Sequence, residues 1–549
     1  MIPARDEEAW IGRALEALAA QTGIDPAAYE VILVLDGCLD GTRESALAVA
    51  AARPCLRLHL LELPAVGVGA ARGAGMDAAC RRLLDLGRPH GLVATTDADT
   101  EVAGDWLAAQ LRAVAGGACA VGGRILLGDD GGGNGAAVRW RERSLVTRMA
   151  AVGAADGATE HPHFSGASLA VTAEVYARAG GLEDRPALED EAFERSLRRL
   201  GVPIARPADV RVLTSARTTG RAPRGLARDL ALAAWLDRRL YAACTLSPAE
   251  LASLRTASVS VIVPAREVAS SIGAVVDVLV SCRDAGLVEE VLVVDAGSVD
   301  GTAEVAAAHG AEVVQESALR PEFGPCRGKG DAMWRGLSAT SGEIVVFVDA
   351  DTENFHRGFV TSLLAPLFAD DGLQLVKGSF GRPFQLGTSV LPTGGGRVTE
   401  LLARPLLNLH RPALAGFAQP LAGEIAARRE LLEALWFPVG YGVEIAMLLD
   451  ADDLVGVDAL GQADLGLRQN RHQPLRDLSA MALAVLVAAE RRLFGAAAVE
   501  ALAPGPLALP FEELEIRHVA VEERPPVREA DGGPLAAPLT RDASTSARW

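Results

Sequence analysis

The chain has 549 residues, which at roughly 100–200 residues per domain is enough for about three domains or two large ones. Half of the residues are apolar and 23% are charged, so the composition excludes a disordered or collagen-like polymer. Lys+Arg 53 against Asp+Glu 71 gives a net charge of −18. A field of that sign repels nucleic-acid backbones and anionic lipid headgroups, so both are poor first hypotheses for a partner.

The seven cysteines are an odd number and are scattered without a Cys-x-x-Cys pair. Neither a disulfide framework nor a zinc site is expected, and a reducing cytoplasm fits this pattern. The amino terminus lacks a basic start followed by an apolar core, and no apolar run approaches the ~18 residues needed to span a bilayer. We therefore expect a cytoplasmic protein without a membrane span.

Lysine is almost absent from this chain. Only Lys329 and Lys377 are lysines, so the other 51 of the 53 basic residues are arginines. In such a background each lysine deserves separate inspection.

Two halves of the sequence repeat each other at nearly constant offsets of 261, 260 and 252 residues. The paired segments are Pro3-Ala4-Arg5 with Pro264-Ala265-Arg266, Asp40-Gly41-Thr42 with Asp300-Gly301-Thr302, and Asp97-Ala98-Asp99 with Asp349-Ala350-Asp351. Two versions of one domain in tandem explain this better than chance.

The expected elements alternate between strand and helix along each copy. The first copy begins where its opening strand should already be finishing, and the join lies near 245–256, where Ser247-Pro248 is a plausible helix start. The second copy predicts strands at 259–263, 291–294 and 344–348 and a helix that includes 272–280. Such a pattern favours an α/β fold with a mostly parallel sheet, and ligands bind such sheets beyond the carboxyl ends of the strands.

Domain boundaries follow from the repeat and from composition. We expect one domain at 1–245, a second at 246–527 and a disordered tail at 528–549, where Gly, Pro, Ser and Ala leave little to bury.

Asp349 and Asp351 follow a predicted buried strand. Two carboxylates at a strand end can hold Mg²⁺ or Mn²⁺ against a diphosphate, because these hard cations prefer oxygen ligands and share their shell with phosphates. A solvated turn is the alternative for an isolated Asp-x-Asp. The preceding strand and the other motifs favour the cation site.

The motifs of the second copy resemble those of glucosyl-3-phosphoglycerate synthases over roughly 257–527. Motifs typical of that family occur in its order: Pro264-Ala265-Arg266, Asp295-Ala296-Gly297-Ser298, Arg327-Gly328-Lys329-Gly330, Asp349-Ala350-Asp351, Thr393-Gly394-Gly395-Gly396-Arg397-Val398-Thr399-Glu400, Gln419-Pro420-Leu421-Ala422-Gly423-Glu424 and Tyr441-Gly442-Val443-Glu444. The resemblance implies a GT-A (Rossmann-like) fold and a retaining transfer of glucose from UDP-glucose to the 2-hydroxyl of 3-phosphoglycerate with Mg²⁺ or Mn²⁺.

The same resemblance implies roles for individual residues. Asp295, Ser298 and Pro264 would bind the nucleotide, Asp349 would lie near the ribose and uracil, and Asp351 would bind the metal. Glu444 would hold sugar hydroxyls or, less favoured, act as a base; helix capping is its structural alternative. Glu424 is a weaker candidate of the same kind.

Residue chemistry supports an anion site beside that cation. Lys329 between two glycines suits a diphosphate as a point charge, although a surface lysine is the alternative. Gly396, Arg397 and Thr399 offer backbone N–H groups, a guanidinium fork and a hydroxyl, which suit the carboxylate and phosphate of a phosphoglycerate. A Gly-rich hairpin with an exposed arginine is the alternative there.

Two positions depart from the family pattern. Val268 stands where a glutamate usually contacts the uridine, and Asn470 stands where a histidine usually binds the metal. His472 lies two residues further on, so either Asn470 or His472 is expected to serve the metal.

The first copy resembles glycosyltransferase family 2, a family that typically inverts. The resemblance implies that Asp97 and Asp99 hold nucleotide and metal, and that Asp190 is the general base on an acceptor hydroxyl. His161 and His163 are more typical of a loop than of a metal pair. The basic stretch Arg217, Arg221 and Arg224 either closes over a diphosphate or is a solvated face.

The sequence therefore predicts a bifunctional glycosyltransferase, two tandem GT-A domains in all, with UDP-glucose and 3-phosphoglycerate as ligands of the second and an unknown acceptor for the first. A homo-oligomer is possible. The alternatives are that one copy is an inactive nucleotide-sugar scaffold, that the second makes mannosyl-3-phosphoglycerate, or that the enzyme is a nucleotidyltransferase, for which the 393–400 block has no evident role.

Overall fold

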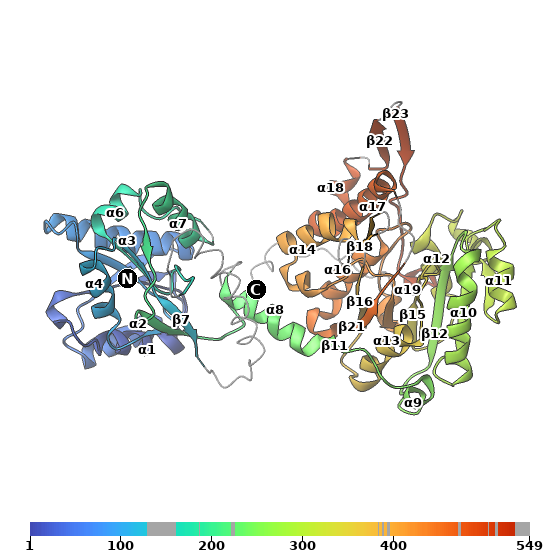
Figure 1. The fold of residues 1–549 in the computed structure, drawn as a ribbon, viewed down its shortest axis with the longest axis horizontal. Helices are drawn as coiled ribbons and strands as arrows, with labels where there is room; N and C mark the ends of the chain where they lie inside the picture. Colours follow the sequence, from blue (N-terminus) through green and yellow to red (C-terminus); the bar gives the residue numbers. More distant parts are fainter. Residues whose placement is uncertain are drawn as a thin grey trace. The chain divides into compact units, whose positions relative to one another are not determined.

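The computed structural model divides the chain into two compact units, Met1–Ala234 and a second that begins at Trp235 (Figure 1). It describes residues 1–128, 161–185, 187–220, 225–382, 384–386, 389–391, 396–469, 474–502, 504–510 and 514–532. No helix in these ranges combines the length and the apolar character that crossing a membrane requires.

The first unit is an α/β structure whose strands form three small sheets, ordered β1-β2-β3, β4-β8-β6-β9 and β5-β10-β7. Its strands are β1 (Ile2–Ala4), β2 (Val31–Asp36), β3 (Leu58–Leu63), β4 (Leu92–Thr95), β5 (Thr100–Val102), β6 (Ala120–Gly122), β7 (Arg124–Leu127), β8 (Leu169–Thr172), β9 (Ile204–Ala205) and β10 (Arg211–Thr214). Its helices are α1 (Glu8–Ala19), η1 (Pro26–Ala28), α2 (Thr42–Ala52), α3 (Val68–Asp85), α4 (Trp106–Ala115), α6 (Ala173–Arg178) and α7 (Glu189–Arg199). Helix α8 (Leu226–Arg239) runs from this unit into the next.

The second unit contains one sheet of eight strands, ordered β11-β21-β16-β19-β15-β12-β13-β14. The strands of this unit are β11 (Leu240–Tyr241), β12 (Val259–Ala265), β13 (Glu290–Asp295), β14 (Glu312–Gln315), β15 (Ile344–Phe347), β16 (Leu375–Gly381), β19 (Ile425–Arg428) and β21 (Leu460–Leu467), with the short pairs β17 (Phe384–Leu386) and β18 (Ser389–Leu391), β20 (Phe437–Pro438) and β24 (Glu523–Arg524), and β22 (Pro506–Pro510) and β23 (Leu514–His518). Only β19 runs antiparallel to its two neighbours in the large sheet, so the prediction of an α/β fold with a mostly parallel sheet is confirmed.

Helices cover both faces of this sheet and enclose two apolar cores. They are α9 (Pro248–Ala252), α10 (Ala269–Asp284), α11 (Thr302–Ala308), α12 (Lys329–Leu337), α13 (Arg357–Ala369), α14 (Arg404–His410), α15 (Arg429–Leu432), α16 (Val443–Val455), α17 (Leu475–Phe494), α18 (Ala496–Glu500) and α19 (Val527–Ala530), with the short turns η2 (Glu316–Ala318), η3 (Pro321–Phe323), η4 (Thr399–Ala403), η5 (Pro412–Gly416) and η6 (Val457–Ala459). One core lies against α12, α16 and α17 and the other against α10 and α13 (Figure 1). Because strand residues alternate between the two faces, Leu375 belongs to the first core and Val376 to the second.

Element boundaries differ from the sequence expectation at three places. Strand β12 continues through Pro264 to Ala265, since β15 pairs with β12 only as far as Ile262 and no neighbour on that side needs the missing proline N–H. The second unit begins at Trp235, whose indole packs in the core of that unit and donates to Val457 O at 2.9 Å. Helix α19 includes the first residues of the expected tail, and residues 533–549 lie outside the described part.

The opening strand of the first unit is shorter than its counterpart in the second. Strand β1 has three residues and pairs only with β2, whereas the seven-residue β12 pairs with both β13 and β15. Within the described residues, the strands of the first unit form three separate sheets, whereas eight strands of the second unit form one.

The repeat extends to individual hydrogen bonds. Asp6 and Glu267 both have positive φ, 49° and 53°, and each carboxylate accepts a bond from a distant backbone N–H, at 2.6 Å from Leu39 and 2.9 Å from Val299. Positive φ is uncommon outside glycine, so this shared conformation is a specific feature of both turns.

Candidate active site

Charged side chains converge at one edge of the eight-stranded sheet. Asp295 ends β13, Asp349 follows β15 and Arg468 follows β21, and these strands run in the same direction. Glu424 immediately precedes the antiparallel β19, whose amino end meets the same edge. The topology therefore gathers residues that are far apart in sequence at the position where ligands bind such sheets.

Lys329 joins two of these carboxylates. It occupies the first turn of α12, and its Nζ donates to Asp349 Oδ1 and, at 2.6 Å, to Glu444 Oε1 in the first turn of α16. Burial disfavours the ammonium, but the two carboxylates outweigh this and raise the pKa of Lys329. The pKa of Asp349 is held far below its usual range, because Lys329 and Arg468 overcome the effect of its burial.

Arg468 holds the other side of the carboxylate cluster. Its guanidinium lies 2.7 Å from Asp349 Oδ2, 2.9 Å from Glu424 Oε1 and 3.3 Å from Asp351 Oδ1. Burial raises the pKa of Glu424 in spite of this contact. Asp349 is thus saturated by cations, whereas the Asp351 side chain is 50% exposed and makes only the long contact to Arg468 among the described residues.

A glycine is required where the chain passes this cluster. A Cβ built on Gly423 would lie 2.4 Å from Asp349 Oδ1 and 2.5 Å from Lys329 Nζ. The Gln419–Glu424 segment therefore packs directly on the ion pair, and no side chain fits between them.

The predicted nucleotide residues lie along the neighbouring strands. Asp295 is fully buried; its Oδ2 accepts from Ser298 N at 3.1 Å and from Gln315 Nε2 at 2.8 Å, and its Oδ1 has no hydrogen-bond partner. Pro264 pairs in register with Val294, one residue before Asp295. A buried acceptor without a partner is an opening for a ligand N–H.

The predicted acceptor residues belong to a turn that leads into η4. Gly396 has φ +72°, Arg397 is half-buried and Thr399 is buried. A Cβ on Gly396 would lie 3.4 Å from Arg382 Cδ, and Arg382 follows β16 at the carboxyl edge. The turn therefore lies close to the Arg382 side chain.

Several residues of this cluster were not predicted as site residues. Arg382 and Arg468 carry no distinguishing signal in a chain with 51 arginines. Lys377 was one of the two lysines: it is fully buried on β16, it donates to Ala422 O at 3.0 Å, and burial lowers its pKa to about 8. Its rarity was the available signal.

Some predicted residues lie outside the described part of the chain. These are Asn470, His472, Arg221 and Arg224, together with residues 393–395 of the glycine run.

The first unit builds a comparable cluster from other cations. Arg72 is buried and lies 2.8 Å from Asp97 and 2.9 Å from Glu189. Arg217 lies 2.9 Å from Asp99 Oδ2 and donates to both carboxylate oxygens of Glu7. Burial, together with Asp97, raises the pKa of Asp99 to about 6.

Asp190 has a different environment from its counterpart in the second unit. Both Asp190 and Glu444 are the second residue of a helix, α7 and α16. Asp190 accepts backbone N–H groups from Gly166 at 3.0 Å and Glu191 at 2.8 Å, and burial raises its pKa to about 6. In the described residues no arginine or lysine forms an ion pair with Asp190, whereas Lys329 binds Glu444.

Helix entry is also alike in the two clusters. A Cβ on Gly69 would lie 2.1 Å from Arg185 O, and one on Gly330 would lie 1.9 Å from Pro438 O. Each glycine is the second residue of its helix, α3 or α12, and each carbonyl precedes the helix that carries the acid. The residue before each glycine is the first of its helix, so Val68 in α3 corresponds to Lys329 in α12.

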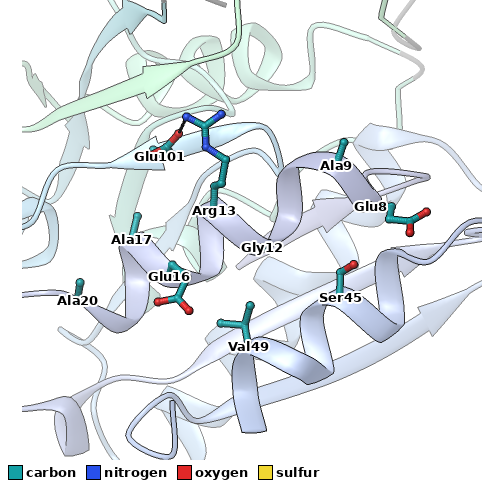
Figure 2. A pocket seen from close by; sticks show the side chains of 10 residues that line it. All are labelled: Glu8, Ala9, Gly12, Arg13, Glu16, Ala17, Ala20, Ser45, Val49 and Glu101. Atoms are coloured by element: carbon teal, nitrogen blue, oxygen red, sulfur yellow. Dashed lines mark ion pairs between the residues drawn. The ribbon is translucent and has the colours of Figure 1, made fainter. Parts of the chain in front are cut away.

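Two other features of the first unit do not belong to this cluster. His161 and His163 are buried and hydrogen-bonded to backbone groups, as a structural loop requires. A groove of about 610 Å³ lies between α1 and α2, lined by the residues that Figure 2 labels, and none of them is a predicted site residue.

Comparison with known proteins agrees with the repeat. A sequence model of glycosyl transferase family 2 matches residues 1–175 and 260–393, one stretch in each half. A glucosyl-3-phosphoglycerate synthase from Mycolicibacterium paratuberculosis is 41% identical over 302 residues, which are 54% of this chain and 91% of that protein. The synthase of the same name from Mycobacterium tuberculosis is 48% identical over 232 residues, 42% of this chain and 71% of the relative.

Solved structures are similar to the same half. Mannosyl-3-phosphoglycerate synthase from Rubrobacter xylanophilus has a TM-score of 0.50 and 41% identity, covering 54% of this chain and 99% of its own. The Mycobacterium tuberculosis synthase, with a TM-score of 0.46 and 39% identity over 52% of this chain and 97% of its own, was solved with Mn²⁺, uridine diphosphate and glucosyl-3-phosphoglycerate. The chain therefore belongs to glycosyl transferase family 2, and its second half to the family of glucosyl-3-phosphoglycerate synthases.

Proposed function

We propose that the second unit transfers glucose from UDP-glucose to the 2-hydroxyl of 3-phosphoglycerate, and that it requires Mg²⁺ or Mn²⁺. The observation that carries this proposal is the meeting of Lys329, Asp349 and Asp351 at the carboxyl edge of the sheet. The names of the relatives, 41–48% identical, support the choice of substrates.

Asp351 is the carboxylate that fits a divalent cation. Asp349 already has Lys329 on one oxygen and Arg468 on the other, whereas Asp351 is half exposed. A cation bound there supplies positive charge to the departing diphosphate. Asn470 and His472, the other proposed ligands, lie outside the described residues.

The ammonium of Lys329 is proposed to stabilise the departing diphosphate as well. Two of its three N–H groups are used by Asp349 and Glu444, so it is held at a fixed position and keeps one donor for a diphosphate oxygen. Preorganised charge of this kind stabilises a leaving group without reorganisation during the reaction.

Glu444 is proposed as a sugar-hydroxyl acceptor rather than as a base. Lys329 Nζ donates to its Oε1 at 2.6 Å, so this oxygen is already occupied by the ammonium. A unit without a free base at this position is suited to a retaining transfer. We place Asp295, Ser298 and Pro264 at the nucleotide and Gly396, Arg397 and Thr399 at the acceptor.

The test uses the full chain with UDP-glucose, 3-phosphoglycerate and Mg²⁺. UDP release should exceed the acceptor-free background, chelation of the metal should abolish it, and the anomeric configuration of the product should match that of the donor. Asp351→Asn should lower turnover at least about 100-fold, whereas Asp371→Asn, at a 93% exposed aspartate, should not. No UDP release above background from the wild-type chain would sink the proposal.

A mannosyl transfer is the second candidate, because the similar Rubrobacter xylanophilus structure is a mannosyl-3-phosphoglycerate synthase. Assays with UDP-glucose and GDP-mannose in parallel decide between the donors.

For the first unit we propose a second, inverting transferase with an acceptor still to be identified. Asp97 and Asp99 would hold the nucleotide and metal, and Asp190, with a raised pKa and no cation partner in the described residues, suits a general base. The full chain should then bind two molecules of UDP, one of which is lost in Asp99→Asn. One UDP per chain, unaffected by Asp99→Asn, would instead favour the scaffold alternative.

A further inference from the structure

Arg382 and Arg468 face one aromatic ring from the same edge of the sheet. Their guanidinium carbons lie 5.1 Å and 5.5 Å from the centre of the Phe380 ring. Phe380 is buried near the end of β16, and Arg382 follows that strand directly. Both arginines therefore lie within cation–π distance of the same ring.

The two guanidiniums differ in their charge partners. Arg468 lies within 3.3 Å of three carboxylates, those of Asp349, Asp351 and Glu424. Arg382 forms no ion pair with any acid in the described ranges, and its Nε is buried without a hydrogen-bond partner. Burial and the nearby Arg468 lower the pKa of Arg382, so its positive charge is disfavoured in the absence of a ligand.

An incompletely satisfied cation of this kind indicates a missing anion. Buried charged groups are costly unless they are paired and hydrogen-bonded. Asp349, Asp351 and Glu424 favour the charge of Arg382 from a distance, but none of these three acids forms an ion pair with it. The Arg382 side chain is only partly buried, so a ligand can reach it.

The position of Arg382 indicates which anion it binds. A Cβ on Gly396 would lie 3.4 Å from Arg382 Cδ and 3.7 Å from Thr399 Cβ, so the Arg382 stem passes under the turn proposed for the acceptor. We infer that Arg382 binds an oxyanion of the acceptor, its phosphate or its carboxylate. This inference rests on the proposed function and adds a specificity-determining residue to it.

The chemistry of arginine suits this assignment. A guanidinium offers a planar fork that matches two oxygens of a phosphate or carboxylate, and it stays charged in a partly buried place. Lysine at this position would offer a point charge without the fork. A neutral side chain of similar length would leave the acceptor oxyanion without its counter-charge.

Binding to the full chain tests the inference without requiring turnover. With UDP and Mn²⁺ present, Arg382→Met should weaken 3-phosphoglycerate binding about 30-fold or more, and Arg382→Lys should recover part of that loss. The affinity for UDP should change less than about twofold. Arg404→Met is the matched control, because Arg404 begins α14, a few residues after the proposed acceptor turn, but is paired with Glu400.

Two truncated acceptors identify the anion. Glycerate lacks the phosphate and glycerol 3-phosphate lacks the carboxylate. If Arg382 holds the phosphate, Arg382→Met leaves glycerate binding unchanged; if it holds the carboxylate, glycerol 3-phosphate is the unaffected ligand. Either result supports the inference, whereas equal weakening of both overturns it in favour of a general field effect.

The remaining outcomes are also decisive. Unchanged 3-phosphoglycerate binding in Arg382→Met overturns the inference, and weaker UDP binding instead assigns Arg382 to the donor. Because methionine replaces a partly buried cation that has no ion pair in the described residues, the melting temperature should not fall. If it does fall, Arg382→Lys gives the same test. A wild-type chain that binds 3-phosphoglycerate but releases no UDP would remove the proposed function and leave the role of Arg382 intact.

Discussion

Replacing Lys329 with methionine removes one ammonium that serves two buried carboxylates. Asp349 and Glu444 have side chains that are 16% and 5% exposed. Asp349 keeps Arg468 at 2.7 Å, but Glu444 has no second ion pair among the described residues. Removing one partner of a buried pair costs about 3–5 kcal/mol. Since one carboxylate stays paired, we expect the low end, about 3 kcal/mol of the free energy of unfolding.

Calorimetry of the full chain measures this loss. At about 2 °C per kcal/mol for a unit of this size, the unfolding transition of the second unit should fall by about 6 °C, and that of the first should not move. Arg404→Met, which breaks a surface pair, should cost less than about 1 kcal/mol.

The loss should also depend on pH. In the folded wild type the pKa of Asp349 is depressed below that of an unfolded aspartate, about 3.9. The ionised carboxylate therefore stabilises the fold above about pH 4, and this stabilisation is lost as the pH falls further. The variant lacks much of this contribution, so the gap between the two proteins should narrow below about pH 4. A loss under about 1 kcal/mol at pH 7, or a gap that is the same at pH 7 and pH 3, would refute the reasoning.

Three further predictions concern single residues. Gly423→Ala places a methyl group against the Lys329–Asp349 pair, so it should lower UDP release at least about tenfold and the free energy of unfolding by about 1–3 kcal/mol. Gly104→Ala is the control, because no atom lies within 4 Å of the added Cβ, and it should change neither quantity. Lys377→Met should be up to about 2 kcal/mol more stable than the wild type at pH 7, because the folded state disfavours the ammonium. This gain should fade as the pH rises from 8 to above 10, and urea titrations at pH 7 and above pH 10 measure it. The raised pKa makes ionised Asp190 costly in the folded protein, so the free energy of unfolding of Asp190→Asn relative to the wild type should rise by about 2 kcal/mol from pH 4 to pH 8. Melting curves in which this difference does not change with pH would contradict the prediction.

The sequence was informative wherever an unusual residue or a fixed spacing carried the signal. The strand ends at Asp295 and Asp349 and the repeat could be predicted, because β-branched runs followed by acids are uncommon by chance. The rarity of lysine singled out Lys329, although its ion pair with Asp349 was not predicted. Asn470 and His472 stay predictions.

The parts that sequence reasoning missed depend on tertiary contacts. Arg468 and Arg382 could not be distinguished from the other arginines until the sheet brought them beside Phe380. The second unit starts at Trp235, whose indole packs in the core of that unit, a contact that no local composition change marks. Arg72 lies one helical turn after Val68, and only its contacts with Asp97 and Glu189 show that it is the cation of the first cluster.

The near-absence of lysine makes this protein a convenient object for chemical labelling. Amine-selective reagents meet only two side chains in 549 residues, and both lie in the same cluster. Lys377 has no exposed surface and Lys329 is tied to two acids, so acylation should be slow in the resting protein and should report on opening of this one region. Immobilisation or dye coupling through lysine side chains will accordingly fail on the folded chain.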